Sequence, residues 1–562
     1  MPAEAVDFQA LRFARTRHAD QDAAEPVHHP VVVVGAGPVG LALAIDLAQR
    51  GVRVGLLDND DTLSTGSRAI CFAKRTLEVF DRLGCGQRMV DKGVSWNVGR
   101  VFFRDAQVYQ FDLLADKGHA RPAFVNLQQY YVEGYLAQRA AELPFIDLRW
   151  KNAVTGVEQR ADHAVLTVDT PDGPYELVAD HVVACDGSRS ALRRLTGQQS
   201  EGRVFRDRFL IADVRMKVDF PAERWFWFDP EFHPKQSVLL HMQPDGIWRI
   251  DFQLGWDADP EVEKRPENIV PRVKALLAGS AMKNAQFELE WASVYTFACT
   301  RMAHFRVGRV LFAGDAAHGV SPFGARGANS GVQDADNLGW KLALVSAGQA
   351  PDALLDSYAS EREQAADENI LHSTRATDFI TPKSEVSRLF RDAVLDLARD
   401  HPFARTLVNS GRLSVPTTLD GSPLNTPDSA HFEGRMRPGA AAADAPVMHA
   451  DDHIGWLLRE LGDDFTALVY GDADAGRLDA HWRQAAEGLA PLRIVHIRPC
   501  GAVAPARAMH CLVDHEGLVA ERYDMLPGTV YLLRPDQHVC ARWRRISGEA
   551  MQTALRRALA IP

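Results

Sequence analysis

Three short segments of this chain combine glycine with an acidic residue in patterns that suit the binding of a phosphorylated cofactor. In the first, "VVVVGAGPVG", four valines precede a glycine-rich turn, and a second apolar run ends at Asp58. Gly35 permits the tight turn, Gly37 lets the backbone approach a pyrophosphate, and Gly40 lets the following helix pack closely on the strand. Pro38 lies in the same turn and belongs to the predicted site. The segment therefore predicts a βαβ unit that binds a dinucleotide.

The other two segments, "VADHVVACDGSRS" and "GRVLFAGDAAH", each place an acid after a buried apolar strand. These acids are Asp186 and Asp315. In an open parallel sheet, ligands bind outside the carboxyl ends of the strands, so we expect Asp58, Asp186 and Asp315 to face one crevice. Asp58 is placed to accept hydrogen bonds from a ribose. Two alternatives stay open at this point, because FAD and NAD(P) are bound by the same physics and a glycine turn can serve packing alone.

Together the three segments resemble the signatures of the flavoprotein aromatic hydroxylases, the single-component FAD-dependent monooxygenases that include para-hydroxybenzoate hydroxylase, phenol hydroxylase and the 3-(3-hydroxyphenyl)propionate hydroxylases. The resemblance covers most of the chain. It implies that FAD is bound, that NAD(P)H docks transiently without a domain of its own, and that O2 is the oxidant. It also assigns further FAD contacts to Arg68, Gln129, Asp186, Gly187, Gly314 and Asp315.

The stretch "SPFGARGANSGVQDADNL", residues 321–338, places three glycines and an arginine directly before a run that reads as a helix. It resembles the family loop that runs beneath the pyrimidine edge of the isoalloxazine. The positive end of the helix would stabilise the negative charge of reduced flavin by about 0.3 to 2 kcal/mol. We expect Gly327 and the amides of Ala328 and Asn329 to make this contact. The carbonyl of Pro322 is expected near the reactive face of the ring.

Between the second and third signatures, residues 200–297 contain alternating apolar and polar runs, typical of an antiparallel sheet, and "QPDGIW" predicts a hairpin turn. We predict that this sheet is inserted into the FAD domain and forms the far wall of a largely apolar substrate pocket. The predicted lining residues are Trp225, Trp227, His241, Phe252 and Tyr295. Tyr295 and His241 are the candidates to bind or deprotonate a phenolic substrate. Aromatic residues that serve only as core are the alternative.

The predicted fold class combines α/β and α+β architecture. A Rossmann-like FAD-binding domain carries an inserted antiparallel-sheet substrate domain, as in the para-hydroxybenzoate hydroxylase fold, and a thioredoxin-like domain follows. The predicted boundaries are a flexible N-terminal extension 1–28, FAD-binding domain 29–199, substrate-binding sheet 200–297, second part of the FAD-binding domain with helices 298–414, linker 415–447 and C-terminal domain 448–562. The last domain lacks CxxC, so thiol redox chemistry is not expected there.

Composition and charge exclude several classes of function. The chain has 562 residues, 46% of them hydrophobic, and a formal charge of −11, which predicts a globular protein without a nucleic-acid partner. Seven cysteines lack metal-ligand spacing and favour a reducing compartment. We find neither a secretory signal nor an apolar run of membrane length, so we expect a cytoplasmic protein with no membrane partner and no metal. A homodimer is implied by the resemblance alone.

The function that the resemblance implies is NAD(P)H-consuming hydroxylation of a phenolic aromatic compound through a flavin C4a-hydroperoxide, in aromatic catabolism. The protein would contribute positioning, a dry pocket and help in deprotonating the phenol. The alternatives are an FAD-dependent dehydrogenase or oxidase without oxygen insertion, a non-enzymatic FAD-binding protein, and a hydroxylase of a larger polyketide phenol. A halogenase is disfavoured because "RWFWFD" does not supply the WxWxIP motif. The sequence distinguishes neither NADH from NADPH nor the exact phenol and its site of hydroxylation.

Overall fold

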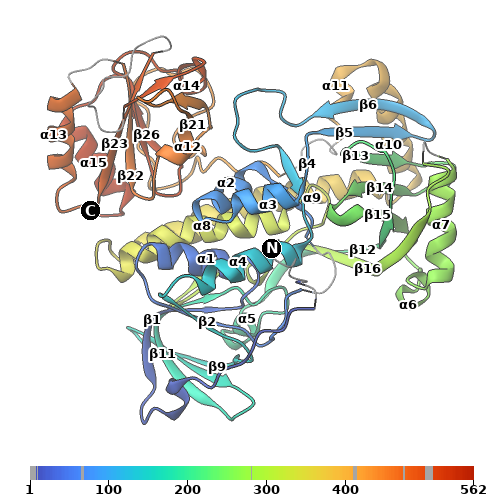
Figure 1. The fold of residues 1–562 in the computed structure, drawn as a ribbon, viewed down its shortest axis with the longest axis horizontal. Coiled ribbons are helices and arrows are strands. Elements are labelled where there is room, and N and C mark those ends of the chain that lie inside the picture. The colour runs from blue at the N-terminus through green and yellow to red at the C-terminus, as the bar shows by residue number, and fades with distance from the viewer. Residues whose placement is uncertain are drawn as a thin grey trace.

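The computed structural model describes residues 8, 10–64, 69–279, 282–408, 414–471, 475–499 and 511–562. These residues build three large sheets and one small sheet, and each large sheet carries its own helices (Figure 1). Two long helices, α8 (Gly327–Ser346) and α9 (Leu354–Ile380), pack against each other and connect the three sheet units. Among the described residues, no helix combines the length and apolar character that a bilayer crossing demands.

The first sheet is mixed, with a parallel centre, and its main strand order is β17-β18-β11-β1-β2-β8. Strands β18, β11, β1, β2 and β8 run parallel, so their carboxyl ends meet at one edge of the sheet. Strands β9 and β10 continue beside β11 in antiparallel fashion. The bounds are β1 (Val27–Val34), β2 (Val54–Leu57), β8 (Ile146–Arg149), β9 (Ala153–Gln159), β10 (Ala164–Asp169), β11 (Tyr175–Ala184), β17 (Arg306–Val307) and β18 (Val310–Phe312).

Helices cover this sheet because its central strand is apolar on both faces. Valines 31–34 are almost completely buried, as a strand inside a doubly covered parallel sheet requires. Helix α1 (Pro38–Gln49) packs against α8 and against α4 (Gln129–Ala141) on one side (Figure 1). Nearby lie α2 (Lys74–Arg82), α3 (Gly86–Lys92) and the small sheet of β3 (Cys71–Ala73), β7 (Phe124–Asn126) and β4 (Val94–Trp96).

The second sheet is wider than the predicted segment 200–297, because strands from other parts of the chain join its edges. Its order is β19-β16-β12-β15-β14-β13-β5-β6, with β5 parallel to β13 and the other pairs antiparallel. The predicted hairpin turn joins β14 to β15 through Asp245 and Gly246, both with positive φ. The bounds are β5 (Val98–Phe103), β6 (Ala106–Asp112), β12 (Ser200–Met216), β13 (Arg224–Phe228), β14 (Ser237–Met242), β15 (Ile247–Leu254), β16 (Phe287–Met302) and β19 (His318–Gly319).

Side chains of the second sheet alternate between two faces that are covered by different helices. One face packs with α7 (Pro266–Ala278), and its buried residues include Leu210, Ala212, Val214, Leu240, Ile250 and Phe252. The opposite face packs with α9 and α10 (Glu385–Asp400), and its buried residues include Val101, Phe103, Phe209, Phe226, Phe228 and Leu239. The alternation of the sequence is therefore real, but both faces are covered.

The C-terminal unit contains the third sheet, with strand order β21-β20-β24-β23-β22-β25-β26. Its core is continuous with residues of the first unit, since Trp340 of α8 and Leu354 of α9 belong to the same buried cluster. The bounds are β20 (Pro446–Met448), β21 (Ile454–Trp456), β22 (Phe465–Tyr470), α13 (Ala475–Ala486), β23 (Leu492–Arg498), β24 (Cys511–Asp514), α14 (Leu518–Tyr523), β25 (Val530–Leu533), β26 (Val539–Trp543) and α15 (Gly548–Ala558).

Four fully buried charges, which we call the latch, tie the C-terminal unit to α8 and α9. Glu361 accepts hydrogen bonds from Arg534 at 2.6 Å and Lys341 at 2.7 Å, and Arg534 also pairs with Asp536 at 2.6 Å. Burial lowers the pKa of Lys341 to about 8, although Glu361 opposes this shift. Burial alone would raise the pKa of Glu361, but Arg534 and Lys341 hold it below its usual value. Ser422, in the predicted linker, also donates to Glu361.

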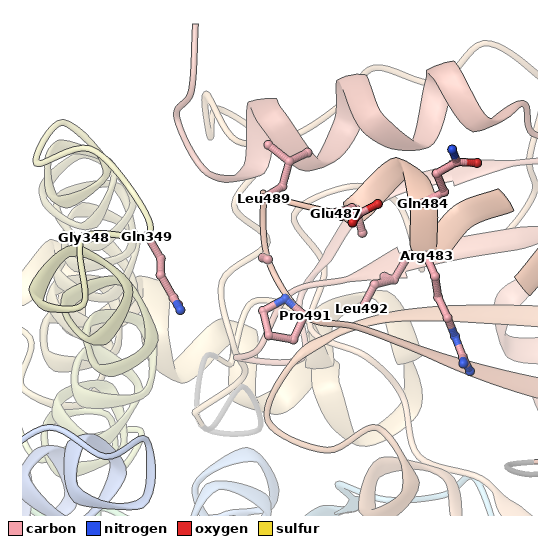
Figure 2. A pocket seen from close by; sticks show the side chains of 11 residues that line it. Gly348, Gln349, Arg483, Gln484, Glu487, Leu489, Pro491 and Leu492 are labelled. Atoms are coloured by element: carbon pink, nitrogen blue, oxygen red, sulfur yellow. The ribbon is translucent and has the colours of Figure 1, made fainter. Parts of the chain in front are cut away.

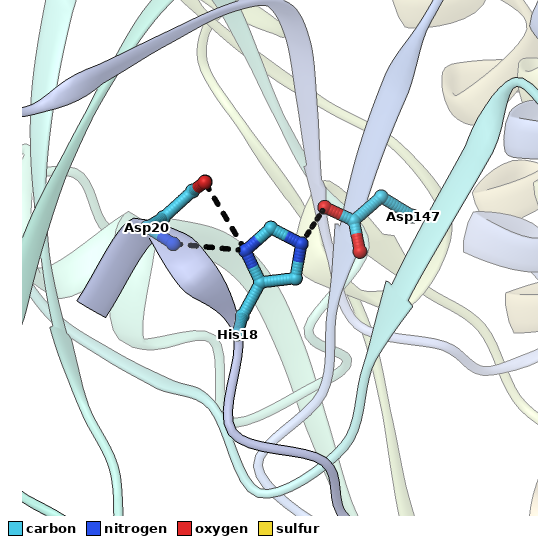
Figure 3. A group of neighbouring side chains, drawn as sticks. All are labelled: His18, Asp20 and Asp147. Atoms are coloured by element: carbon cyan, nitrogen blue, oxygen red, sulfur yellow. Dashed lines mark hydrogen bonds and ion pairs between the residues drawn. The ribbon is translucent and has the colours of Figure 1, made fainter. Parts of the chain in front are cut away.

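The residues before β1 pack on the first unit, so the expectation of a flexible extension is wrong for residues 10–26. His18 lies between the carboxylates of Asp20 and Asp147, at 3.1 and 3.2 Å (Figure 3). Arg149 pairs with both carboxylates, at 2.6 Å from Asp20 and 2.5 Å from Asp147. The cluster is thus a network of hydrogen bonds and ion pairs that belongs to the fold, and we assign it no metal.

Candidate active site

The turn after β1 has the shape that a cofactor-binding glycine motif requires. Gly35 adopts a φ of +105°, and a Cβ there would lie 2.4 Å from the carbonyl oxygen of Cys185. A Cβ at Gly40 would lie 1.9 Å from the carbonyl oxygen of Gly35. At Gly37, by contrast, nothing lies within 4 Å of the Cβ position. Packing thus requires two of the glycines, and the third borders open space at the start of α1, just before Pro38.

The three predicted acids follow parallel strands and therefore lie at one edge of the first sheet. Asp58 follows β2, Asp186 follows β11, and Asp315 follows β18. The Asp58 carboxylate accepts hydrogen bonds from the amides of Ala36 at 2.6 Å and Asp60 at 2.8 Å. Burial raises the pKa of Asp58, although these two amides act in the opposite direction. Asp58 thus holds the glycine turn beside the end of β2 through its hydrogen bond to Ala36.

Asp186 has one carboxylate oxygen that the fold uses and one that it does not. The first accepts hydrogen bonds from the amides of Ala191 at 2.7 Å and Leu192 at 3.1 Å, at the start of α5 (Ala191–Leu195). The second is buried and has no hydrogen-bond partner among the described residues. Gly187 follows with a φ of +76° and open space at its Cβ position. A buried acceptor without a partner costs free energy, so this oxygen suits a ligand that donates a hydrogen bond.

The turn after β18 is held by Asp334, a residue that sequence reasoning missed. Its carboxylate accepts from the amide of Gly314 at 2.9 Å, and Nε2 of His318 lies 2.7 Å from the same oxygen. Arg362 donates to the other oxygen at 2.6 Å. Burial alone would raise the pKa of Asp334, but His318 and Arg362 hold it below its usual value. The network positions the exposed Asp315 at the sheet edge and leaves His318 a structural role.

Helix α8 begins at Gly327, directly after the loop that we predicted to run beneath the flavin. The amides of Gly327, Ala328 and Asn329 have no acceptor within the helix, as at every helix start. The Asn329 side chain accepts from the amide of Ala73 at 2.8 Å and donates to the carbonyl of Cys71 at 2.9 Å. One residue therefore joins the first turn of α8 to strand β3.

The loop before α8 is tightly turned and anchored to α9. Gly324 and Ala325 have φ of +100° and +52°. The carbonyl of Pro322, which we predicted near the reactive face of the ring, accepts the amide of Ala325 at 3.1 Å. Arg326 is buried and donates to Asn369 of α9 at 3.2 Å. The main chain of this loop is thus fixed before any ligand binds.

Gln129, at the start of α4, forms hydrogen bonds to the residues on both sides of segment 65–68. Its amide nitrogen donates to Ser64 Oγ at 3.0 Å, and its oxygen accepts from the amide of Ala69 at 3.0 Å. Arg68, the neighbouring predicted contact, lies outside the described residues. The other described residues meet the requirements of FAD with groups of the right chemistry. The glycine backbone and helix amides can donate to phosphates, and the acids, including the unpartnered oxygen of Asp186, can accept from hydroxyls. The residues present fit this cofactor.

A line of buried polar side chains, which we call the polar row, crosses the second sheet on the face opposite α7. Arg224, His241, Arg249 and Asp213 are register neighbours on β13, β14, β15 and β12. Cys71 of β3 reaches this row, with its Sγ 4.0 Å from Nδ1 of His241. The carbonyl of Cys71 is held by the first turn of α8, as described above. The polar row therefore lies beside the predicted flavin loop.

The charges of the polar row are only partly paired. Arg249 Nε binds Asp213 at 2.9 Å. Asp251 lies 3.6 Å from Nε2 of His241, and burial raises the pKa of Asp251 to about 6, although Arg249 and Arg224 oppose this. Burial, Arg224 and Arg249 lower the pKa of His241 well below 6.5, so its imidazole is neutral at pH 7. Within the described part of the chain, the guanidinium of Arg224 has no hydrogen bond or ion pair.

The structure separates the residues that we predicted to line the substrate pocket. His241 belongs to the polar row. Trp225, Trp227 and Phe252 lie on the other face and pack in the core over α7, because neighbouring positions of a strand point to opposite faces. Tyr295 shares the face of His241 but lies farther along the sheet and is 40% exposed. The three aromatic residues are thus core residues of the face that α7 covers.

Sequence reasoning missed the charged members of this face, although a signal for them exists. In "IWRIDF", Arg249 and Asp251 occupy alternate positions, and the other four residues of this segment are apolar. Arg224 and Asp213 stand in similar surroundings. Charged side chains inside apolar strands must be paired or must bind something, because their burial is costly.

A surface pocket of about 840 Å³ lies elsewhere, between the end of α8 and the C-terminal unit (Figure 2). Gly348 and Gln349 border it on one side, and residues of α13 and β23 border it on the other. None of its lining residues belongs to the glycine turn, the α8 loop or the polar row. We therefore give it no part in the chemistry.

A glycine turn, acids at the ends of parallel strands and a second sheet beside the α8 loop define the class as an FAD-binding monooxygenase of the para-hydroxybenzoate hydroxylase fold. Residues 28–373 match the family described as FAD binding domain, and the chain belongs to this family. It is a flavin-dependent aromatic hydroxylase, and enzymes of this class use FAD, NAD(P)H and O2.

Individual relatives agree with this assignment. The chain is 30% identical over 524 residues to the 3-(3-hydroxy-phenyl)propionate/3-hydroxycinnamic acid hydroxylase of Mycobacterium avium strain 104, covering 90% of this chain and 88% of that one. It is 33% identical over 367 residues to the 12-dehydrotetracycline 5-monooxygenase/anhydrotetracycline 6-monooxygenase of Streptomyces rimosus, covering 62% and 69%. The crystal structure of the flavin-dependent monooxygenase PieE in complex with FAD and substrate has the same fold, with a TM-score of 0.79 at 20% identity over 96% of this chain and 100% of that one.

Proposed function

We propose that this protein hydroxylates a phenol that also carries a carboxylate group. The observation that carries the proposal is Arg224, which is 6% exposed, forms no ion pair with any described residue, and stands beside His241 on the polar row. A buried cation without a partner is costly, and a carboxylate can accept two parallel hydrogen bonds from a guanidinium. The relative from Mycobacterium avium, whose printed name combines a phenol with a carboxylic acid, supports this choice.

The cofactor would be held by the residues at the edge of the first sheet. The glycine turn and α1 would receive the pyrophosphate, Asp58 the ribose, and Asp186 and Asp315 the remaining polar groups of FAD. When bound and reduced by NAD(P)H, FAD would supply the electrons that activate O2, of which one oxygen atom enters the phenol and the other leaves as water. The first turn of α8 would place its amides, through Asn329, against the edge of the ring that gains negative charge.

His241 would accept the proton of the substrate hydroxyl. Its lowered pKa keeps the imidazole neutral, which is the form that can act as a base, and Asp251 at 3.6 Å would orient the ring. We assign this role to His241 rather than to Tyr295, because the tyrosine is exposed and lies away from the polar row. The helices on both faces of the second sheet would keep water from the reacting groups.

The test compares acidic and neutral phenols as substrates of the FAD-loaded protein. Substrate-stimulated NAD(P)H oxidation and a product one oxygen heavier are expected for 3-(3-hydroxyphenyl)propionate, with weaker turnover of 3-ethylphenol. Arg224→Gln should raise KM for the acid by about 100-fold, the value of a buried charge-assisted pair, and leave KM for the neutral phenol nearly unchanged. Arg215→Gln, a change at an exposed position of β12, is the matched control. An equal rise in KM for the acidic and the neutral phenol in Arg224→Gln would contradict the proposal.

A larger polyketide phenol is the second candidate, favoured by the similarity to the Streptomyces rimosus enzyme. The same assay with anhydrotetracycline separates the two, because only the preferred class should couple NAD(P)H oxidation to oxygen insertion. Reduction of an artificial acceptor without oxygen insertion into any phenol would instead indicate a dehydrogenase.

We also propose that the C-terminal unit has a thioredoxin-like fold. In support, its central strands follow the order β23-β22-β25-β26, with β22 and β23 parallel around α13 and with β25 and β26 antiparallel before α15. Cys540 of β26 is buried and forms no disulfide with any described residue, which agrees with a structural use of this fold.

A further inference from the structure

Helix α10 carries a stripe of exposed apolar side chains on its side away from the second sheet. The stripe consists of Val386, Leu389, Phe390, Ala393 and Leu397. Its four large side chains are 78%, 71%, 59% and 45% exposed. The spacing i, i+3, i+4, i+7 and i+11 puts all five on one side of a helix. Val394, Leu395 and Ala398, on the opposite side, pack onto the sheet. Both sides of α10 are therefore apolar, and the described residues cover only one of them.

The next helix extends the same surface. Helix α11 (Pro402–Arg405) packs against α10, and Phe403 and Leu407 are 65% and 49% exposed (Figure 1). Large apolar residues scattered singly on a surface are ordinary, but a contiguous group of this kind marks a contact surface.

The charges along one border of the stripe indicate what covers it. Glu385 at the start of α10 and Arg399 in its last turn are both exposed and lie on the same border. In the sequence, position 392 lies midway between Glu385 and Arg399. The midpoint of the stripe, which runs from Val386 to Leu397, lies half a residue from position 392. A two-fold axis through this point would lay the stripe of one copy antiparallel on the stripe of another, and would set each Glu385 beside the Arg399 of the other copy. Asp392, at the centre, is neutralised by Arg391 of its own helix at 2.8 Å.

We propose that two copies of this chain associate through α10 as an antiparallel helix pair about a two-fold axis. Such an interface uses one surface twice, so the surface must be complementary to itself. The stripe meets this condition in its apolar residues and in its charges, whose midpoints lie half a residue apart. Arg388 and Asp396 also have position 392 as their midpoint, and Asp396 lies 3.9 Å from Arg399 of its own helix. The proposal is independent of the substrate of the enzyme.

The first experiment measures the mass of the FAD-loaded, full-length protein by sedimentation velocity over a wide range of concentrations. The wild-type protein should be a dimer that dissociates on dilution. Leu389→Glu should be monomeric at every concentration, while Leu526→Glu, at an exposed position of the C-terminal unit, should dimerise as the wild type does. Flavin content and NAD(P)H oxidation should be the same in all three, which shows that each variant is folded.

The second experiment exchanges the border charges. Glu385→Arg and Arg399→Glu should each weaken dimerisation about tenfold, and the double variant should regain the wild-type affinity. Fourteen residues separate the two positions, about 21 Å along one helix, so only a second copy can restore the pair. A wild-type monomer at all concentrations, a Leu389→Glu dimer, or a double variant no better than the single ones would overturn the proposal. Monomers that sediment with phosphatidylcholine and phosphatidylglycerol vesicles would replace it with a lipid contact.

Discussion

At the scale of single residues, the buried His241 makes the stability of the protein depend on pH. Its pKa is lowered in the folded state by burial, Arg224 and Arg249, whereas the unfolded chain takes up this proton below about pH 6.5. The unfolded state then binds more protons, so this contribution to stability is present above pH 6.5 and is lost as the pH falls. Asp251 acts in the opposite direction, because its pKa is raised to about 6.

We therefore expect His241→Gln to change the pH dependence of unfolding in urea. Between pH 7 and pH 5 the variant should lose roughly 2 kcal/mol less stability than the wild-type protein, because the proton uptake of one histidine is removed. The exposed His304→Gln serves as the control and should follow the wild-type curve. Parallel curves for His241→Gln and wild type would show that this imidazole is not desolvated.

At the scale of elements, Asn329 couples the first turn of α8 to β3. Asn329→Ala leaves the amide of Ala73 and the carbonyl of Cys71 without their partner, so it should cost about 2 to 4 kcal/mol of unfolding free energy. Because the α8 amides lose their fixed position, FAD should also dissociate more readily, as an increase in free-flavin fluorescence on dilution would report. Ser346→Ala, at the exposed far end of α8, should change neither quantity. If Asn329→Ala retains FAD as the wild-type protein does, the hydrogen bonds of Asn329 to β3 do not contribute to cofactor binding.

At the scale of the whole molecule, the latch makes the C-terminal unit part of one folding unit with α8 and α9. Arg534→Met should destabilise the protein by about 3 to 5 kcal/mol, because Glu361 and Asp536 stay buried and lose the cation that they share, which leaves Glu361 with Lys341 alone. Arg437→Met removes an exposed pair with Asp420 and should cost less than about 1 kcal/mol. Thermal unfolding, followed by circular dichroism and by flavin fluorescence, measures the stability lost in both variants. Separate transitions for the two signals in the wild-type protein would contradict a single folding unit.

The features that sequence alone predicts are those set by neighbours along the chain. The glycine turn, the acids after buried strands and the Asp-Gly hairpin depend on local backbone geometry, and the structure contains each of them. Strand alternation revealed two faces in residues 200–297 but not which helix covers each, so Trp225 and His241 were assigned to one pocket although they point apart. Ion pairs such as Glu361 with Arg534 form only when distant segments of the chain come together, so no local sequence pattern predicts them.

The stretch that precedes the first strand bears on how the enzyme is handled at the bench. Phe13 stacks on Trp150 with ring centroids 4.3 Å apart. Asp20 forms an ion pair with the side chain of Arg149. The carbonyl of Arg149 accepts a hydrogen bond from the amide of Asp58 at 3.0 Å. A truncation that starts at the first strand, or a purification tag in place of this stretch, would loosen the residues that pack behind Asp58. Such a preparation should emerge from the column paler, with less yellow pigment per mole of polypeptide.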